Sequence, residues 1–86
     1  MVSDESSRLT DSAIAAMFSH PVDAERFQPI LNFHEAATLL RIPAETLRAW
    51  RSYGWLHGCC RKVGKRVLFL RDRLIKRVFN EGLHAE

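Results

Sequence analysis

The middle of the chain predicts two short helices joined by a tight turn, and this pair constrains the fold more than any other feature. Asn32 is a favourable N-cap residue, and Glu35, three residues later, completes a variant of the capping box. Pro43 suits the first position of a second helix, which is expected to run from about Pro43 or Ala44 to Tyr53. The chain therefore has to fold around a helix pair with a short, sharply defined connection.

Apolar side chains at helical spacing indicate which face of each helix is buried. The first helix carries an apolar stripe of four residues: Phe33, Ala36, Ala37 and Leu40. The second helix is expected to bury Leu47 and Trp50, and Gly54 suits the position that follows its end. Between the two helices, Ile42 of the turn can reach the core.

A β-hairpin and a last helix are predicted after this pair. The expected strands, Cys59–Val63 and Arg66–Leu70, flank Gly64, which can supply the positive φ of a tight turn. Two strands alone are unstable in water, so the hairpin has to pack on the helices. The last helix is expected from about Arg71 or Asp72 to Gly82, with four residues facing inward: Leu74, Ile75, Val78 and Phe79.

The N-terminal third is read separately. Residues 1–10 are polar and charged and are predicted to be a disordered tail. Residues 11–31 are predicted to be a helical extension, whose first helix is capped by Asp11 or Ser12 and ends before Pro21. A helical turn is possible near Asp23–Phe27. The expected domain is then 32–81, with a C-terminal tail at 82–86, and the fold class is mainly α with a small β-hairpin, a winged helix-turn-helix.

Charge divides the chain into two unlike parts. Residues 1–31 contain two basic and five acidic residues, a net charge of −3, whereas residues 32–86 contain eleven basic and five acidic residues, a net charge of +6. All eleven of these basic residues fall between Arg41 and Arg77. A polyanionic partner would relieve the repulsion within this cluster, although a solvated basic surface is the alternative.

Double-stranded DNA is the expected partner, bound through two surfaces. A second helix of this kind presents its outer face to the major groove, and a basic hairpin tip suits the phosphate backbone or a minor groove. The candidate residues of the helix are Ala44, Glu45, Thr46, Arg48, Ala49, Arg51 and Ser52. The candidate residues of the hairpin are Arg61, Lys62, Lys65 and Arg66. Both sets also have a purely structural interpretation, as the polar face of an amphipathic helix and as charges that prevent edge-to-edge aggregation.

Catalysis, metal binding and membrane insertion are not expected. No Gly-rich phosphate loop or paired-acid motif occurs, so we predict no enzyme activity and no cofactor. Cys59 and Cys60 are adjacent, and adjacent cysteines rarely form a disulfide with each other. Together with His57 they match no common zinc-ligand spacing. No apolar run approaches the roughly 18 residues of a membrane span. The N-terminus does not resemble a signal peptide, so a cytoplasmic location is expected.

The segment from Asn32 to Leu47, together with Val63-Gly64-Lys65-Arg66, resembles the excisionase-type winged helix-turn-helix proteins, which are related to the MerR-like DNA-binding fold. The resemblance implies a recombination directionality factor, bacterial and nucleoid-associated, that binds tandem attachment sites cooperatively, bends them and helps a tyrosine integrase to excise a mobile element. The turn departs from the family pattern, with Arg41-Ile42-Pro43 in place of Gly-Val-Ser, and an extension of about thirty residues precedes the domain. A small transcriptional regulator of the same fold is the alternative. A protein-interaction adaptor with a basic face is the alternative of another class.

Self-association is expected because a single module of this size buries only about 600–1,000 Å² on DNA. Tandem sites repeat in one direction, which implies head-to-tail contacts between copies. The candidate residues are Ile14, Met17, Phe18, Phe79 and Leu83. Deletion of residues 1–28 is expected to abolish cooperative binding and to leave binding to a single site.

Overall fold

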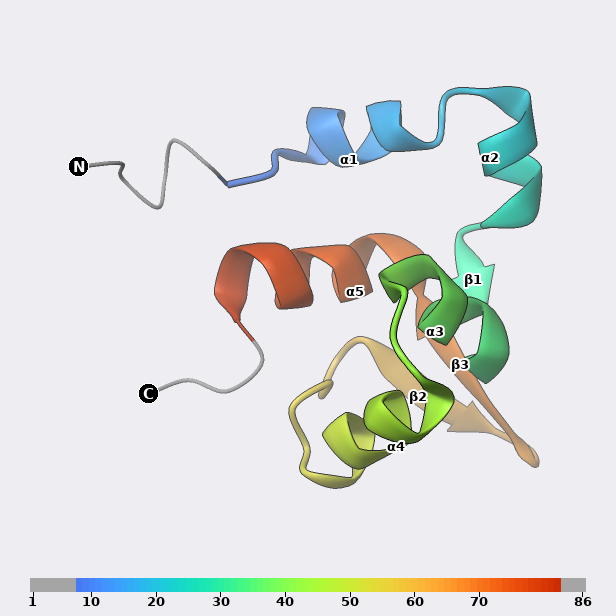
Figure 1. Cartoon of the computed structure of the whole chain (residues 1–86), viewed down its shortest axis with the longest axis vertical. Coiled ribbons are helices and arrows are strands. Elements are labelled where there is room, and N and C mark those ends of the chain that lie inside the picture. The colour runs from blue at the N-terminus through green and yellow to red at the C-terminus, as the bar shows by residue number, and fades with distance from the viewer. Residues whose placement is uncertain (1–7, 83–86) are drawn as a thin grey trace.

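Within residues 8–82, which the computed structural model describes, short helices pack with a small antiparallel sheet (Figure 1). The elements in chain order are α1 (Asp11–Met17), α2 (Pro21–Arg26), β1 (Ile30–Leu31), α3 (Phe33–Leu40), α4 (Ala44–Ser52), β2 (Cys60–Val63), β3 (Arg66–Leu70), α5 (Arg71–Lys76) and the π-helical η2 (Arg77–Glu81). The expected mainly α architecture with a small hairpin agrees with this arrangement. No helix in the described residues is long and apolar enough to cross a membrane.

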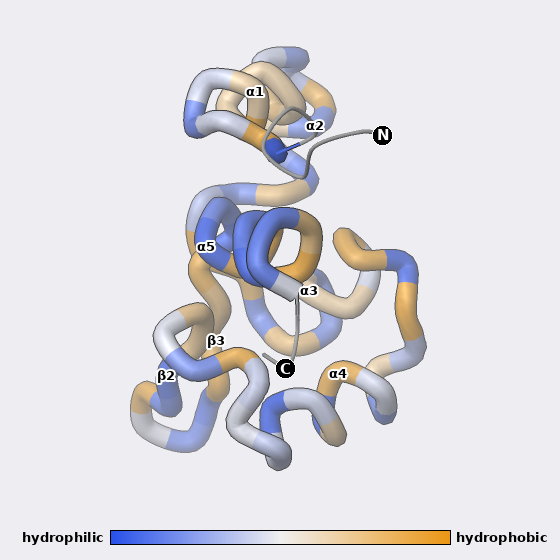
Figure 2. The backbone as a smooth tube through the Cα atoms, turned by 90° about the vertical axis from the view of Figure 1, so that its left-hand side faces the viewer, coloured by the Kyte–Doolittle hydropathy of each residue, from blue (hydrophilic) through white to orange (hydrophobic). Residues whose placement is uncertain are grey.

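The elements form three levels along the long axis of the molecule. In both Figure 1 and Figure 2, α1 and α2 lie at one end, α5 and α3 lie in the middle, and α4 lies with the β2–β3 hairpin at the other end. α1 and α2, with Asp11, Asp23 and Glu25, therefore lie at the opposite end from the basic hairpin.

The sheet has the strand order β1-β3-β2, with both pairs antiparallel. Gly64 has a φ of 63°, which confirms the predicted hairpin turn. Leu31 pairs with Phe69, and this adds a third strand to the predicted hairpin. This pairing gives the hairpin a support that two strands alone lack.

The main core lies between the sheet and the helices. Phe69 and Leu31 of the sheet and Leu47 and Leu74 of the helices are completely buried. The ring of Phe33 packs edge-on against that of Phe69, with centroids 5.5 Å apart. Burial of these side chains supplies the dominant stabilisation of so small a chain.

The predicted helix pair is confirmed in its caps. The Asn32 Oδ1 accepts from the Glu35 N–H at 2.7 Å, and the Glu35 carboxylate accepts from the Asn32 N–H at 2.9 Å, so the capping box is complete. Arg41 ends α3 in the left-handed conformation, with a φ of 59°. Pro43 takes the N-cap position of α4 and not its first helical position, because its ψ of 147° is extended. The predicted inward residues Leu47 and Trp50 pack in the core, Leu47 fully and Trp50 in part.

The N-terminal third folds against α5. Thr10 caps α1 in place of the predicted Asp11 or Ser12, because its hydroxyl accepts from the Ala13 N–H. The side chains of Ile14 and Phe18 are buried against Ile75. This corrects their expected role in contacts between copies, since their own chain already covers them. Of the other three candidates, Met17 and Phe79 are exposed, and Leu83 lies outside the described residues.

Both ends of the described chain meet. The Leu9 N–H donates to the Asn80 Oδ1 at 2.7 Å, and the Asn80 amide donates to the Leu9 carbonyl at 2.8 Å. The predicted disordered tail covered residues 1–10; residues 1–7 lie outside the described part, and at Leu9 the prediction was wrong. These two bonds extend the folded N-terminal segment beyond α1.

The last helix also differs from its prediction at one face. Leu74 and Ile75 are buried and Val78 is half-buried, as expected, but Phe79 is 62% exposed. The wider π-helical turn of η2 alters which side chains meet the core after Lys76. Gly82, with a φ of 79°, ends this helical segment as predicted.

Candidate nucleic-acid interface

The exposed side of α4 and the tip of the β2–β3 hairpin line one open groove of about 540 Å³. The residues that line it are Asn32, Phe33, His34, Arg48, Arg51, Lys65, Arg66 and Val67. Four predicted site residues therefore meet in one place: two arginines of α4, and a lysine and an arginine of the hairpin. The N-terminal turn of α3 completes the groove between them.

Local structure explains why these cations face outward. α4 buries Leu47, and this leaves Arg48 and Arg51 on exposed parts of the helix. Gly64 closes the hairpin, so that Lys65 and Arg66 lie at its turn, with Arg66 opposite Val63 in the register. In Figure 2 much of this turn has the blue colour of hydrophilic residues.

Arg48 is the most constrained cation of the groove. Its guanidinium lies 5.0 Å from the centroid of the Phe33 ring. A cation–π contact of this kind holds the planar guanidinium in place and leaves its N–H groups available as donors. Phe33 thus connects the core, through Phe69, with the floor of the groove.

No carboxylate lines the groove within the described residues. The nearby Glu35 is engaged in the capping box. Four cations at close quarters with no countercharge produce a positive potential, and a bound polyanion would lower their mutual repulsion.

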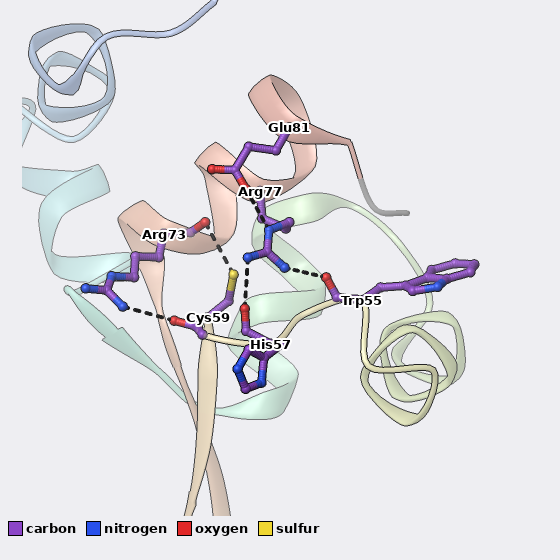
Figure 3. Close-up of polar contacts among 7 residues, drawn as sticks. Trp55, His57, Cys59, Arg73, Arg77 and Glu81 are labelled. Atoms are coloured by element: carbon purple, nitrogen blue, oxygen red, sulfur yellow. Dashed lines mark hydrogen bonds and ion pairs between the residues drawn. The ribbon is translucent and has the colours of Figure 1, made fainter. Parts of the chain in front are cut away.

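The cations of α5 and η2 have a different role, which the sequence did not reveal. Arg77 donates to the carbonyls of Trp55 at 2.7 Å and His57 at 2.9 Å and pairs with Glu81, so it holds the loop after α4 (Figure 3). Arg73 donates to the Gly58 carbonyl of the same loop at 3.3 Å. These cations stabilise the fold.

Arg71 and Lys76 hold the N-terminal third in the same way. The buried Arg71 donates to the Phe27 carbonyl at 2.8 Å, and its guanidinium lies 3.8 Å from the Phe18 ring centroid. Lys76 pairs with Asp11. The single basic cluster from Arg41 to Arg77 that the sequence indicated is therefore two groups.

The second group consists of cations without such partners. Of the eleven basic residues from Arg41 to Arg77, seven form neither an ion pair nor a side-chain hydrogen bond among residues 8–82: Arg41, Arg48, Arg51, Arg61, Lys62, Lys65 and Arg66. All of them except Arg41 belong to the predicted site. An interaction with a bound polyanion would therefore cost no existing ion pair.

The other predicted residues lie around the groove or are partly covered. Glu45 and Ser52 of α4 and Arg61 and Lys62 of β2 are exposed outside its lining. Thr46 and Ala49 are half-buried. Ala44 was predicted to face outward, but it packs against the main core at the first turn of α4.

Sequence reasoning missed Asn32 and Phe33 as groove residues. The first was assigned only as a helix cap and the second only to the core. Both roles are present. Asn32 and Phe33 also line the groove, because the start of α3 lies beside the β2–β3 hairpin. His34 lines the groove as well.

The thiol of Cys59 is not activated. Burial raises the pKa of the Cys59 thiol, and the nearby Arg77 and Arg73 only partly oppose this effect. Its Sγ donates to the Arg73 carbonyl at 3.5 Å (Figure 3). No group of three or more His, Cys, Asp or Glu residues suited to a metal ion occurs in the part of the chain that the structure describes.

No family model, no curated protein and no solved structure matches this chain.

Proposed function

We propose that this protein is a winged helix-turn-helix DNA-binding protein, with α4 as the recognition helix and the β2–β3 hairpin as the wing. The observation that carries the proposal is the open groove in which Arg48, Arg51, Lys65 and Arg66 converge without a carboxylate. A helix and a hairpin that share one cationic groove suit a duplex, since one can enter the major groove while the other follows the backbone.

The two halves of the groove have different roles in this proposal. Arg48, held by the Phe33 ring, has the donor geometry for a guanine edge or for two phosphate oxygens. Lys65 and Arg66, at the end of an exposed turn, attract the DNA phosphate backbone as point charges. They contribute equally to the affinity for every DNA sequence.

Within this class, we infer that the protein is a recombination directionality factor that promotes integrase-mediated excision in a bacterial cytoplasm. The support is the resemblance of residues 32–47 and of the Val63-Gly64-Lys65-Arg66 turn to excisionases. Cooperative, bending binding to tandem attachment sites, and contact with a tyrosine integrase, belong to this inference. A small transcriptional regulator would use the same groove at a single operator.

Salt titration of DNA binding tests the proposal. Fluorescence anisotropy with the full chain and a 20–30 bp duplex (about two to three helical turns) should give a log–log salt slope that Lys65→Ala flattens by about one. Lys76→Ala is the matched control, because Lys76 pairs with Asp11 at the other end of the molecule and should leave the slope unchanged. Equal salt slopes for Lys65→Ala and the native protein would contradict the assignment of the wing to the DNA interface.

Footprinting separates the biological roles. Tandem protected sites beside an integrase core site support excision, and one protected operator at a promoter supports regulation. Absence of any protection at moderate salt would instead favour the adaptor that binds an acidic protein.

A further inference from the structure

Among residues 8–82, the face of the sheet that points away from the main core is apolar and largely exposed. Leu31 and Phe69 face the core, so their neighbours Ile30, Leu68 and Leu70 face the opposite way. We call this surface, with Val63, the outer sheet face. Ile30, Val63 and Leu70 are 57%, 53% and 41% exposed, and they line an open groove of about 780 Å³ with Leu68 and the loop after α4.

Charge restricts what can cover the outer sheet face. The charged side chains that line it are Arg51, Arg61 and Arg73, and no carboxylate lines it within the described residues. Two copies related by a two-fold axis through this face would bring these arginines against their own counterparts. The occupant therefore has to be both apolar and acidic.

One surface of the described chain meets this description. α2 buries no residue, and Val22 on it is 63% exposed. Val22 and Glu25 share one side of α2, and Asp23 borders it. Neither carboxylate has a hydrogen bond or an ion pair among residues 8–82. The one cation of α2, Arg26, lies over the Phe27 ring, 4.9 Å from its centroid.

The remaining carboxylates of the described residues do not form such a surface. Three are in ion pairs and one is in the capping box: Asp11, Asp72, Glu81 and Glu35. Glu45 stands alone among the cations of α4.

We propose that α2 of one copy docks on the outer sheet face of a second copy, with Val22 against Ile30 and Leu70 and with Asp23 and Glu25 among the arginines. The contact is heterologous, so each copy keeps a free α2 and a free outer sheet face and the chain of copies can extend. Its use on adjacent DNA sites rests on the function proposed above, whereas the contact itself needs no DNA.

The size of α2 predicts a weak contact. Six residues of helix are about 9 Å long, and they bury far less than the roughly 1,200 Å² of a stable interface. We expect a dissociation constant of about 0.1–1 mM in solution. Neighbouring sites on one duplex would raise the effective concentration enough for such a contact to act.

Sedimentation velocity and concentration-dependent NMR shifts of the full chain, at low salt and without DNA, test the contact. Amide signals of α2 and of the outer sheet face should shift together as concentration rises. Asp23→Lys/Glu25→Lys and Arg61→Glu/Arg73→Glu should each weaken self-association at least tenfold. An equimolar mixture of the two variants should restore it, because every contact is then again between opposite charges.

Control variants separate the alternatives. Ser12→Lys/Ala16→Lys adds positive charge to exposed positions of α1 and should associate like the native chain. A monomeric native chain at 1 mM overturns the proposal and leaves the outer sheet face to another acidic protein. Native-like association of either charge variant, or a mixture that fails to associate, overturns the pairing of these two surfaces.

DNA binding is scored separately on Asp23→Lys/Glu25→Lys. This variant should bind a single-site duplex as tightly as the native chain, or slightly more tightly, since it loses negative charge. If the native chain self-associates but does not bind DNA, the function proposed above fails and the contact stands.

Discussion

At the scale of single residues, the same amino-acid type has opposite roles according to its partners. Arg71 is buried, with the Phe27 carbonyl, the Asp72 carboxylate and the Phe18 ring around it. Arg48 is exposed, and its one described contact is with a ring. Arg71 therefore belongs to the fold, whereas Arg48 is available to a ligand.

Replacement of Arg71 should be costly. Arg71→Ala leaves the Phe27 carbonyl without its donor and opens a space beside Phe18, and we expect it to lower the free energy of unfolding by about 2–4 kcal/mol. Arg73→Ala removes one exposed hydrogen bond and should cost less than about 1 kcal/mol. Urea denaturation of both variants checks the difference. Equal losses in the free energy of unfolding would contradict the structural role of Arg71.

Cys59 predicts a pH dependence of stability at alkaline pH. Its pKa is raised in the folded protein by burial, so the unfolded thiol loses its proton first, near the ordinary value of 9.0. The stabilisation is therefore complete below that pH and is lost as pH rises through the folded pKa, by at most about 1.4 kcal/mol per pH unit. Thermal melts from pH 8 to 10 should show a steeper decline in melting temperature for the native protein than for Cys59→Ala. Parallel declines would contradict the contribution of Cys59.

At the scale of elements, local signals predicted what local interactions determine. The cap of α3 depends on Asn32 and Glu35, which are three residues apart, and the hairpin turn depends on the φ of Gly64. β1 could not be found in this way, because two residues become a strand only by pairing with Leu70 and Phe69, about forty positions away. The π-helical turn of η2 has no local signal in the sequence that we recognise.

The capping box gives an element-scale prediction. Asn32→Ala removes the acceptor of the Glu35 N–H and should lower the free energy of unfolding by about 1 kcal/mol. Thr38→Ala, at an exposed position of the same helix, should change it by less than 0.5 kcal/mol, the usual range for surface substitutions. Hydrogen exchange should also show faster exchange in the first turn of α3 for Asn32→Ala alone.

At the scale of the whole molecule, the N-terminal third is part of one packed unit. The sequence marked Ile14 and Phe18 as contact residues, but their partner Ile75 lies about sixty residues later, and no sequence pattern specifies that contact. The four groove cations were predicted, because their exposure follows from helix and turn geometry. The structural role of Arg77 was not, because its partners are distant backbone carbonyls.

This packing changes the expected result of deletion. Removal of residues 1–28 would uncover Ile75 and leave Arg71 without its carbonyl partner, so it should destabilise the whole chain and not only cooperative binding. Ile14→Ala tests this with less damage and should cost about 2–4 kcal/mol. Met17→Ala, on the exposed side of α1, should cost less than about 1 kcal/mol. Separate melting of α1 in circular dichroism would argue against a single unit.

The reciprocal bonds between Leu9 and Asn80 have a mechanical consequence. In Figure 1 the segment before α1 and the end of the helix after α5 lie on the side of the molecule away from the hairpin tip. Tension applied between residues 8 and 82 would reach these two bonds before it reached the sheet, so an optical-trap experiment should record a small early extension while the groove keeps its shape. A handle or fluorescent fusion attached there would leave the hairpin tip clear.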